Sequence, residues 1–215
     1  MTPPKAILIG AGGHAGVLLA MLAARSYPVE GLVTPERALH GTQRGGFPIL
    51  GDDEAVLRYA PGTVVLVNAV GSVGDLQGRR RAYERLKARG YGFLTLAHPT
   101  AVVEPGVLLG EGVQVCARAV VQTGASVGDN GLLNSGSIVE HDCRVGAHVH
   151  VATGAILCGG VEVADDVHVG AGAVVIQGIR IGAGATVAAG AVVIRDVAPG
   201  ITVAGVPAKE VSRNG

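Results

Sequence analysis

The sequence predicts a small α/β unit followed by a repeating β structure, and two observations carry this prediction. All six aromatic residues, four Tyr and two Phe, lie within the first 93 positions, and there is no Trp. From residue 101 onward, an aliphatic residue recurs at every sixth position through sixteen consecutive hexapeptides. The chain is 48% hydrophobic, which is enough to bury a core and excludes disorder. We therefore expect an α/β unit over 1–97 and a repeat unit over 98–215.

Charge and cysteine content exclude several classes of protein. Seventeen basic residues balance seventeen acidic ones, so no net field attracts nucleic acid or an anionic membrane. The apolar stretch Ala6–Ile9 is too short for a signal peptide or a membrane span. Cys116, Cys143 and Cys158 are odd in number and form no CxxC, so we interpret them as small hydrophobic residues. These features favour a cytoplasmic protein that binds neither nucleic acid nor membrane.

The first unit alternates predicted strands and helices. Ala6–Ile9 is short, continuous and apolar, as a buried strand is, and a glycine-rich turn and a helix over Val17–Arg25 follow it. The remaining predicted elements are, in order, a strand over Val29–Val33, a short helix over Glu54–Tyr59, a strand over Thr63–Ala69 and a helix over Leu76–Arg89. Alternating β and α elements predict a small doubly wound parallel sheet.

The turn after the first strand has the spacing of a phosphate-binding loop. Gly10-x-Gly12-x-x-Ala15 fits the alanine variant of the dinucleotide fingerprint, in the strand–turn–helix context that favours an anion. A NAD site also needs an acidic residue at the end of the second strand. That end reads Val33-Thr34-Pro35, with Glu36 beyond the proline. We therefore favour a mononucleotide or nucleotide sugar over NAD. The alternative is that the glycines only permit close packing.

A basic cluster in this unit invites a phosphate-binding interpretation as well. Arg79-Arg80-Arg81 lies on the last predicted helix and resembles a phosphate contact. A run of charges on a helix is more often a solvated face, and we predict that here.

The repeat itself defines the second unit. Its third position is Val, Leu or Ile in all sixteen hexapeptides from residue 103 to residue 193, and its first position is small or aliphatic. Each hexapeptide then forms one flat face and one corner, with the aliphatic side chain inward and small residues near the corner. This pattern is similar to the hexapeptide-repeat family. That resemblance implies a left-handed parallel β-helix of about five coils, which forms trimers with active sites between subunits.

The chemically densest stretch of the repeat runs from Asn134 to Cys143. His141 is the fifth residue of its hexapeptide, near a corner, where it adds nothing to an aliphatic core. An ordinary histidine pKa of about 6.5 suits a general base at neutral pH. The neighbouring carboxylates Glu140 and Asp142 are placed to orient the ring. The alternative is a solvated polar corner, as we expect at 165–166.

Three motifs make the resemblance more specific. The sequences GAGGHA at 10–15, IVEHDC at 138–143 and AGVPAK at 204–209 resemble the sugar-nucleotide acetyltransferases of the sialic-acid O-acetyltransferase and bacillosamine-pathway type. The likeness covers nearly the whole chain. It implies that His141 is the general base, with Asp142 and Asn134 at the catalytic site, and that His150 contacts the acetyl donor.

The resemblance also implies binding residues for both substrates. Acetyl-CoA is expected along a groove of the β-helix, contacted by the residues His150, Gly159, Ala173, Gly178 and Lys209. The nucleotide sugar is expected in the first unit, at Gly10, Gly12, Gly13, His14, Thr34 and Gly71. Relatives that bind UDP-sugars often carry paired Asp after the second strand, where this chain has Thr34-Pro35, and the loop over 70–75 is a variant of a glycine–acid motif. The nucleotide and the sugar therefore stay open.

The function implied is direct acetyl transfer from acetyl-CoA to the amino group of a nucleotide-linked amino sugar, by a homotrimer without a metal. One alternative is O-acetylation of a sugar or small metabolite, and another is a non-catalytic trimeric nucleotide-binding module. His148, His150 and His168 raise the further alternative of zinc, as in the gamma-class carbonic anhydrases. Their spacing does not fit that site, which also leaves the first unit unexplained.

Overall fold

The computed structural model describes residues 3–71 and 76–211. The chain divides into two compact units, Met1–Pro99 and Thr100–Gly215. No helix in the described part of the chain is both long and apolar enough to cross a membrane.

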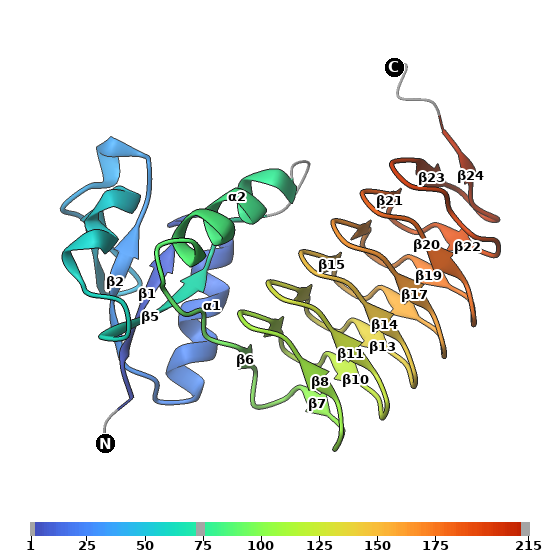
Figure 1. Cartoon of the computed structure of the whole chain (residues 1–215), viewed down its shortest axis with the longest axis horizontal. Helices are drawn as coiled ribbons and strands as arrows, with labels where there is room; N and C mark the ends of the chain where they lie inside the picture. The colour runs from blue at the N-terminus through green and yellow to red at the C-terminus, as the bar shows by residue number, and fades with distance from the viewer. Residues whose placement is uncertain (1–2, 72–75, 212–215) are drawn as a thin grey trace. The chain divides into compact units, whose positions relative to one another are not determined.

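The first unit is a five-stranded sheet with helices, in the strand order β3-β4-β2-β1-β5 (Figure 1). Its strands are β1 (Lys5–Ile9), β2 (Val29–Val33), β3 (Gln43–Arg44), β4 (Phe47–Gly51) and β5 (Val64–Asn68). Its helices are α1 (Gly13–Ala24), η1 (Arg37–Leu39), η2 (Asp53–Arg58) and α2 (Leu76–Lys87), and a short strand β6 (Leu96–Ala97) follows. The chain leaves central β1 for β2 on one side and later returns to β5 on the other.

The prediction of a purely parallel sheet is wrong at one edge. Strands β1, β2, β4 and β5 are parallel, but β3 pairs antiparallel with β4 in a hairpin. The hairpin turns through Gly45 and Gly46, both with positive φ, which glycine adopts without strain. Sequence patterning did not indicate β4 because Pro48 interrupts it, and proline lacks the N–H that a central strand needs.

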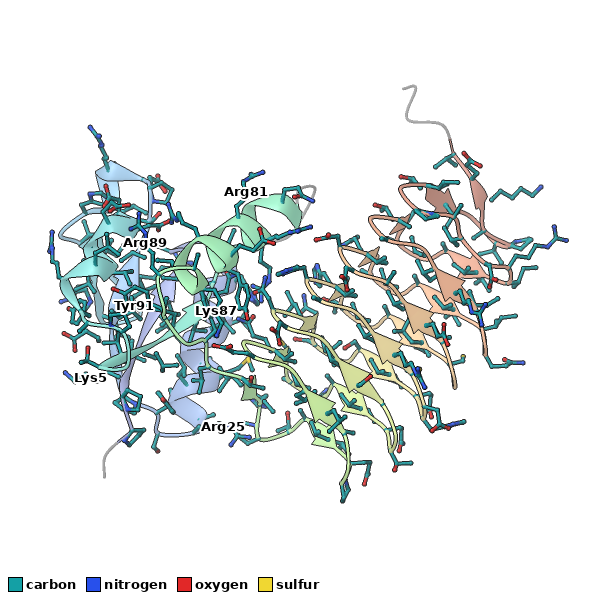
Figure 2. The ribbon with its side chains drawn as sticks, in the orientation of Figure 1. Lys5, Arg25, Arg81, Lys87, Arg89 and Tyr91 are labelled. Atoms are coloured by element: carbon teal, nitrogen blue, oxygen red, sulfur yellow. The ribbon has the colours of Figure 1, made fainter. Side chains whose placement is uncertain are left out.

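Aromatic side chains pack among aliphatic ones in the core of this unit. The rings of Tyr83 and Phe93 lie 4.5 Å apart between centroids. Tyr91, labelled in Figure 2, is 2% exposed, and its hydroxyl donates to the carbonyl oxygen of Tyr59 at 2.7 Å. A buried hydroxyl needs such a partner, because an unpaired polar group loses its hydration without compensation.

The second unit is a stack of short parallel strands in three sheets (Figure 1). The first sheet contains β7 (Val102–Val103), β10 (Val120–Val121), β13 (Ile138–Val139), β16 (Ile156–Leu157), β19 (Val174–Val175) and β22 (Val192–Val193). The second contains β8 (Leu108–Leu109), β11 (Ser126–Val127), β14 (Arg144–Val145), β17 (Glu162–Val163) and β20 (Arg180–Ile181). The third contains β9 (Gln114–Val115), β12 (Leu132–Leu133), β15 (His150–Val151), β18 (His168–Val169), β21 (Thr186–Val187) and β23 (Thr202–Ala204), and β24 (Lys209–Glu210) joins it by antiparallel pairing with β23.

The pairing of these strands confirms the predicted β-helix. Val121 pairs with Val139, and Val139 pairs with Leu157, so successive partners in one sheet are eighteen residues apart. Three hexapeptides therefore make one coil. The third-position aliphatic residue is buried in every hexapeptide from Val115 to Val193. The aliphatic period is thus the inward-facing column of each sheet.

The corners account for ten of the glycines of the repeat. The sixth position of the hexapeptide takes a left-handed backbone conformation, and ten glycines occupy it with φ between +65° and +85°. L-residues pay a steric penalty in this region, whereas glycine has no Cβ to clash. Five other residues adopt the same conformation at this position, namely Arg118, Asn130, Asp142, His148 and Asp166.

Candidate active site

His141 and Asp142 form a pair at one exposed corner of the β-helix, in the turn between β13 and β14. The Nδ1 atom of His141 lies 2.9 Å from Oδ2 of Asp142. Asp142 is one of the five non-glycine residues with positive φ at the sixth position of a hexapeptide, at +60°. When Nδ1 donates to this carboxylate, the proton is fixed there and the lone pair of Nε2 is available to a substrate. The predicted base and its acidic partner are therefore brought together.

Two glycines make room for this pair from the neighbouring coils. A Cβ on Gly159 would lie 2.6 Å from Cε1 of the His141 ring. A Cβ on Gly124 would lie 2.5 Å from Oδ1 of Asp142. Both separations are far below van der Waals contact, so a larger residue at either position must displace the pair. We predicted Gly159 as a donor contact, and the structure places it directly against the imidazole.

A second polar group lies at another corner. Asn134 follows β12, and its Nδ2 atom lies 3.4 Å from Nε2 of His150, the first residue of β15. The Asn134 side-chain oxygen accepts the backbone N–H of Ser135 at 2.8 Å. His150 is 4% exposed, and its ring lies edge-on to that of His168 with centroids 4.9 Å apart. Burial lowers the pKa of His168 below its ordinary value.

These two groups do not meet within one chain. His141 connects the sheet of β13 to the sheet of β14, whereas Asn134 connects the sheet of β12 to that of β13. They therefore lie on different corners of a three-sided coil. The structure brings Asn134 to His150 and His141 to Asp142, but it does not bring the two pairs together.

The remaining predicted donor contacts are dispersed. Ala173 is fully buried at an inward first position. Gly178 is a corner glycine with φ +70° and open space around its Cβ position. Lys209 is exposed on β24, where it lines a cleft of about 400 Å³ together with Arg195.

The cysteines and histidines of the described residues form no metal site, because no three metal-binding side chains gather there. Cys116 and Cys143 are buried and Cys158 is half-buried. The thiol of Cys143 donates to the carbonyl oxygen of Cys158 at 3.2 Å, and burial raises the pKa of the Cys143 thiol.

In the first unit, the glycine loop joins β1 to α1 and leaves open space beside the first residues of the helix. Gly10 has φ +112°, and a Cβ there would lie 2.9 Å from the carbonyl oxygen of Ala69. Gly12 caps α1 without a side-chain hydrogen bond, and the first turn of α1 (all described) has no acidic residue. Nothing lies within 4 Å of a Cβ on Gly12 or Gly13, and half-buried His14 follows them. The N-terminus of α1 is thus open to a ligand.

The other predicted substrate contacts differ in exposure. Thr34 is 6% exposed, and its carbonyl oxygen is 2.8 Å from Nε2 of His40. Its Oγ1 accepts the backbone N–H of Glu36 at 3.3 Å, so the side chain shapes the turn after β2. Gly71 is exposed, and the rest of the predicted glycine–acid motif, 72–75, lies outside the described residues.

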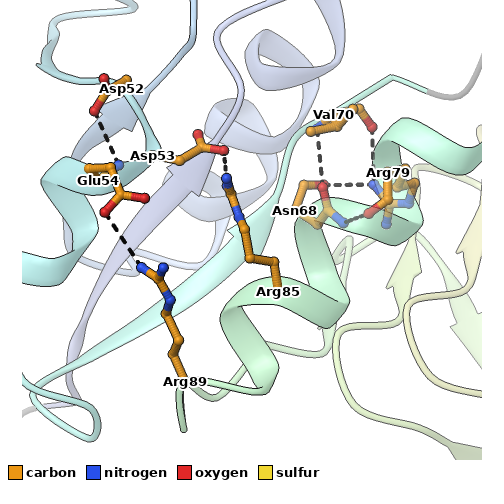
Figure 3. A network of polar contacts seen from close by, with 8 residues as sticks. All are labelled: Asp52, Asp53, Glu54, Asn68, Val70, Arg79, Arg85 and Arg89. Carbon is orange, nitrogen blue, oxygen red and sulfur yellow. Dashed lines mark hydrogen bonds and ion pairs between the residues drawn. The ribbon is translucent and has the colours of Figure 1, made fainter.

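The prediction of a solvated face for the three arginines is wrong for Arg79. Its side chain is 2% exposed, and Nη1 donates to the carbonyl oxygens of Asn68 at 2.7 Å and Val70 at 3.3 Å (Figure 3). Asn68 in turn donates to the carbonyl oxygen of Arg79 at 2.9 Å. Arg80 pairs with Glu84 at 2.7 Å on the surface. Arg79 therefore fixes the end of β5 to α2.

Arg81 lines a cleft at the carboxyl ends of β1 and β5. The cleft measures about 420 Å³ and is lined by Ile9, Gly10, Pro35, Asp53, Val70, Gly78, Arg81, Ala82 and Arg85. Central β1 has its successive neighbours on opposite sides, and ligands of open α/β sheets bind at such a reversal of strand order.

Comparisons with known proteins agree with this architecture. Residues 5–86 match the PglD N-terminal domain family. The acetyltransferase domain of PglB from Neisseria gonorrhoeae is 35% identical, with a TM-score of 0.89 over 96% of this chain and 99% of that chain. The same domain solved with acetyl coenzyme A is 34% identical, with a TM-score of 0.90 over 97% of this chain and 100% of that one.

A second relative was solved with CoA and a nucleotide sugar. A histidine-to-alanine variant of GDP-perosamine N-acetyltransferase from Caulobacter crescentus, in complex with CoA and GDP-perosamine, is 37% identical, with a TM-score of 0.88 over 97% of each chain. A search of curated protein sequences returned no match. The likeness to both enzymes extends over nearly the full length of each, and the chain therefore belongs to the family of nucleotide-sugar acetyltransferases that includes them, as its motifs predicted.

Proposed function

We propose that this chain transfers the acetyl group of acetyl-CoA to the amino group of a nucleotide-linked amino sugar, with His141 as the general base. Its family includes GDP-perosamine N-acetyltransferase and the PglB acetyltransferase domain that was solved with acetyl coenzyme A. The contact between His141 and Asp142 carries the assignment of the base. Their side chains are 60% and 73% exposed, at a corner where Gly124 and Gly159 leave room for them. A histidine so held serves no packing role.

The mechanism is a direct transfer in which the atoms balance without a covalent enzyme intermediate. Nε2 of His141 takes a proton from the acceptor amine as its nitrogen attacks the thioester carbonyl carbon. Asp142 stabilises the imidazolium that forms. The tetrahedral intermediate then expels the thiolate of CoA, which takes the proton from the imidazolium, and the products are an acetamido sugar and free CoA.

The nucleotide end of the acceptor is assigned to the first unit. The open N-terminus of α1, with Gly12 and Gly13, suits the diphosphate, because its unpaired N–H groups and the helix dipole attract negative charge. The cleft beside Gly10 suits the nucleoside. Thr34 holds the turn that brings Pro35 to this cleft.

We assign the active site to the junction of two copies of the chain, in the homotrimer that the family resemblance implies. His141 and the pair of Asn134 and His150 lie on different corners, so one site needs them from neighbouring copies. One face of the β-helix also presents an outward column of aliphatic side chains, which a second copy can bury. These are the first residues of the strands in that sheet, Val102, Val120, Ile138, Ile156, Val174 and Val192.

Thiol release from acetyl-CoA tests the proposed reaction. The acceptors are GDP-, UDP- and dTDP-linked sugars, each as an amino sugar and as the matched hydroxyl sugar. We expect turnover on at least one amino sugar, none on its hydroxyl partner, and a fall in kcat of about 10²–10⁴-fold for His141→Ala. Turnover on hydroxyl sugars would favour O-acetylation instead. Nucleotide binding without any turnover would favour the non-catalytic module.

A further inference from the structure

Among the residues that the structure describes, the cleft at the carboxyl ends of β1 and β5 is lined by one acidic side chain, and it does not come from the end of β2. Thr34 and Pro35 occupy that end. The acidic residue is Asp53, at the start of η2, directly after β4. Because β4 lies beside β2 in the parallel sheet, its carboxyl end opens at the same edge. An acceptor that reaches across this edge therefore meets Asp53.

Asp53 is held by an arginine of the same cleft. Nη2 of Arg85, on α2, donates to Oδ2 of Asp53 (Figure 3). The other carboxylate oxygen, Oδ1, receives no donor from the residues that the structure describes. The Asp53 side chain is 23% exposed and that of Arg85 is 44% exposed, so both are accessible from the cleft. The pair therefore presents an acceptor oxygen and guanidinium N–H donors side by side.

A neighbouring ion pair serves as an internal comparison. Glu54 lies 3.5 Å from Arg89 and also joins η2 to the C-terminal end of α2 (Figure 3). Neither residue lines the cleft. The second pair shows that an ion pair can join these two elements without entering the cleft, so the position of Asp53 and Arg85 in the cleft calls for its own explanation.

We propose that Asp53 and Arg85 bind the base of the acceptor's nucleotide and select guanine. Guanine presents O6 and N7 as acceptors and N1–H and the 2-amino group as donors, and arginine commonly donates to O6 and N7. An ionised carboxylate has about four lone-pair sites, so Asp53 can accept both N1–H and the 2-amino group while Oδ2 also accepts from Arg85. The apolar side chains of Ile9, Val70 and Ala82 give the base a surface to pack against. This inference rests on the proposed function, because it places the nucleotide in the same cleft.

The other common bases satisfy this pair less well. Uracil and thymine have a single N–H between two carbonyl oxygens, so one of those oxygens would face a carboxylate. Adenine has an exocyclic amine but no N1–H, so its ring nitrogen would meet the carboxylate. A site that is built for hydrogen bonds binds a ligand less tightly when that ligand leaves its polar groups unpaired.

The test is equilibrium binding of nucleoside diphosphates to the full chain, by calorimetry without acetyl-CoA. The ligands are GDP, UDP, dTDP, ADP and xanthosine diphosphate, which has a carbonyl oxygen where guanine has its amino group. We expect the native chain to bind GDP at least about tenfold more tightly than the other four. Asp53→Asn replaces one acceptor by an amide donor, so GDP should lose at least about tenfold while xanthosine diphosphate gains affinity. Glu54→Gln should leave all five affinities unchanged.

Three results would overturn the inference, and they separate it from the proposed function. A native preference for UDP or dTDP, with amino-sugar turnover intact, refutes guanine selection and leaves the acetyltransferase standing. Equal losses for GDP and xanthosine diphosphate in Asp53→Asn mean that Asp53 only supports the fold. If no nucleotide binds at all, both the inference and the proposed acceptor fail.

Discussion

The two units of this chain reveal their functional residues in different ways. In the β-helix, the place of a residue in its hexapeptide fixes its environment, so a residue that departs from the pattern is easy to notice. His141 and Asp142 are such departures, because Asp142 stands where ten other hexapeptides have glycine. In the α/β unit, three consecutive arginines have three different environments, and no periodic pattern distinguishes them. In a repeat, the sequence alone identifies the residues that depart from the pattern. In a sheet with helices, the contacts of each residue must be known before its role can be assigned.

The largest expected effect is on stability, and it concerns Arg79, which the sequence does not distinguish from the two arginines that follow it. Arg79→Met removes the guanidinium that donates to the carbonyl oxygens of Asn68 and Val70, and we expect the free energy of unfolding to fall by about 2–4 kcal/mol. Arg80→Ala removes a surface ion pair and should cost about 0–1 kcal/mol. Denaturant unfolding followed by tyrosine fluorescence measures this, because all four tyrosines lie in the first 93 residues. Equal effects for the two variants would contradict the contacts described for Arg79.

The next largest effect is on kcat, and it should differ between the adjacent glycines Gly159 and Gly160 of the β-helix. Gly159→Ala places a Cβ against the His141 ring and should lower kcat by about 10–100-fold, since small displacements of a catalytic group have effects of this size. Gly160 has φ +68° and open space around its Cβ position. Gly160→Ala should therefore lower stability by about 1–2 kcal/mol through backbone strain and leave kcat nearly unchanged. The interpretation of Gly159 is wrong if both variants retain the native kcat.

A smaller effect is expected when the charge of Asp142 is removed. Asn adopts positive φ readily, so Asp142→Asn keeps the corner and the contact to Nδ1 but no longer stabilises the imidazolium by charge. We expect kcat to fall about tenfold. Asp166→Asn is the matched control, because Asp166 has the same backbone conformation at a different corner. Steady-state kinetics of both variants at saturating substrate should show a loss for Asp142→Asn alone.

The smallest effect concerns the half-buried His168. Burial lowers its pKa below the ordinary value of 6.5, so the unfolded chain binds more protons than the folded one as the pH falls below about 6.5. The His168 contribution to stability should be complete above pH 6.5 and should decline as the pH falls toward the folded-state pKa. His168→Phe should remove this part of the pH dependence. Thermal unfolding of both proteins between pH 7.5 and 5 measures the difference, and parallel curves would refute this assignment.

The sequence was most predictive where the pattern is periodic. The sixteen-fold aliphatic column and its corner glycines determine the β-helix, and the contact between His141 and Asp142 agrees with their spacing. The edge hairpin of β3 and β4 could not be predicted, because Pro48 and two-residue strands give no periodic signal.

Contacts between elements that are distant in the chain could not be predicted from the sequence either. The burial of Arg79 depends on carbonyl oxygens at the end of β5, and the role of Gly159 depends on a ring eighteen residues earlier. The place of Asp53 in the cleft depends on β4 lying beside β2, which the predicted elements did not include. Residues that act through tertiary neighbours leave no local signature.

The most direct test of the central claim is activity from two inactive chains. One chain carries His141→Ala, and the other carries Asn134→Ala with His150→Ala. Suppose that each site combines His141 of one copy with Asn134 and His150 of its neighbour. About three quarters of the trimers from an equal mixture are then mixed, and each mixed trimer has one intact site in three. The mixture should therefore regain about a quarter of native activity. Thiol release from acetyl-CoA in co-refolded mixtures measures this recovery. Mixtures as inactive as the separate variants would contradict a site shared between copies.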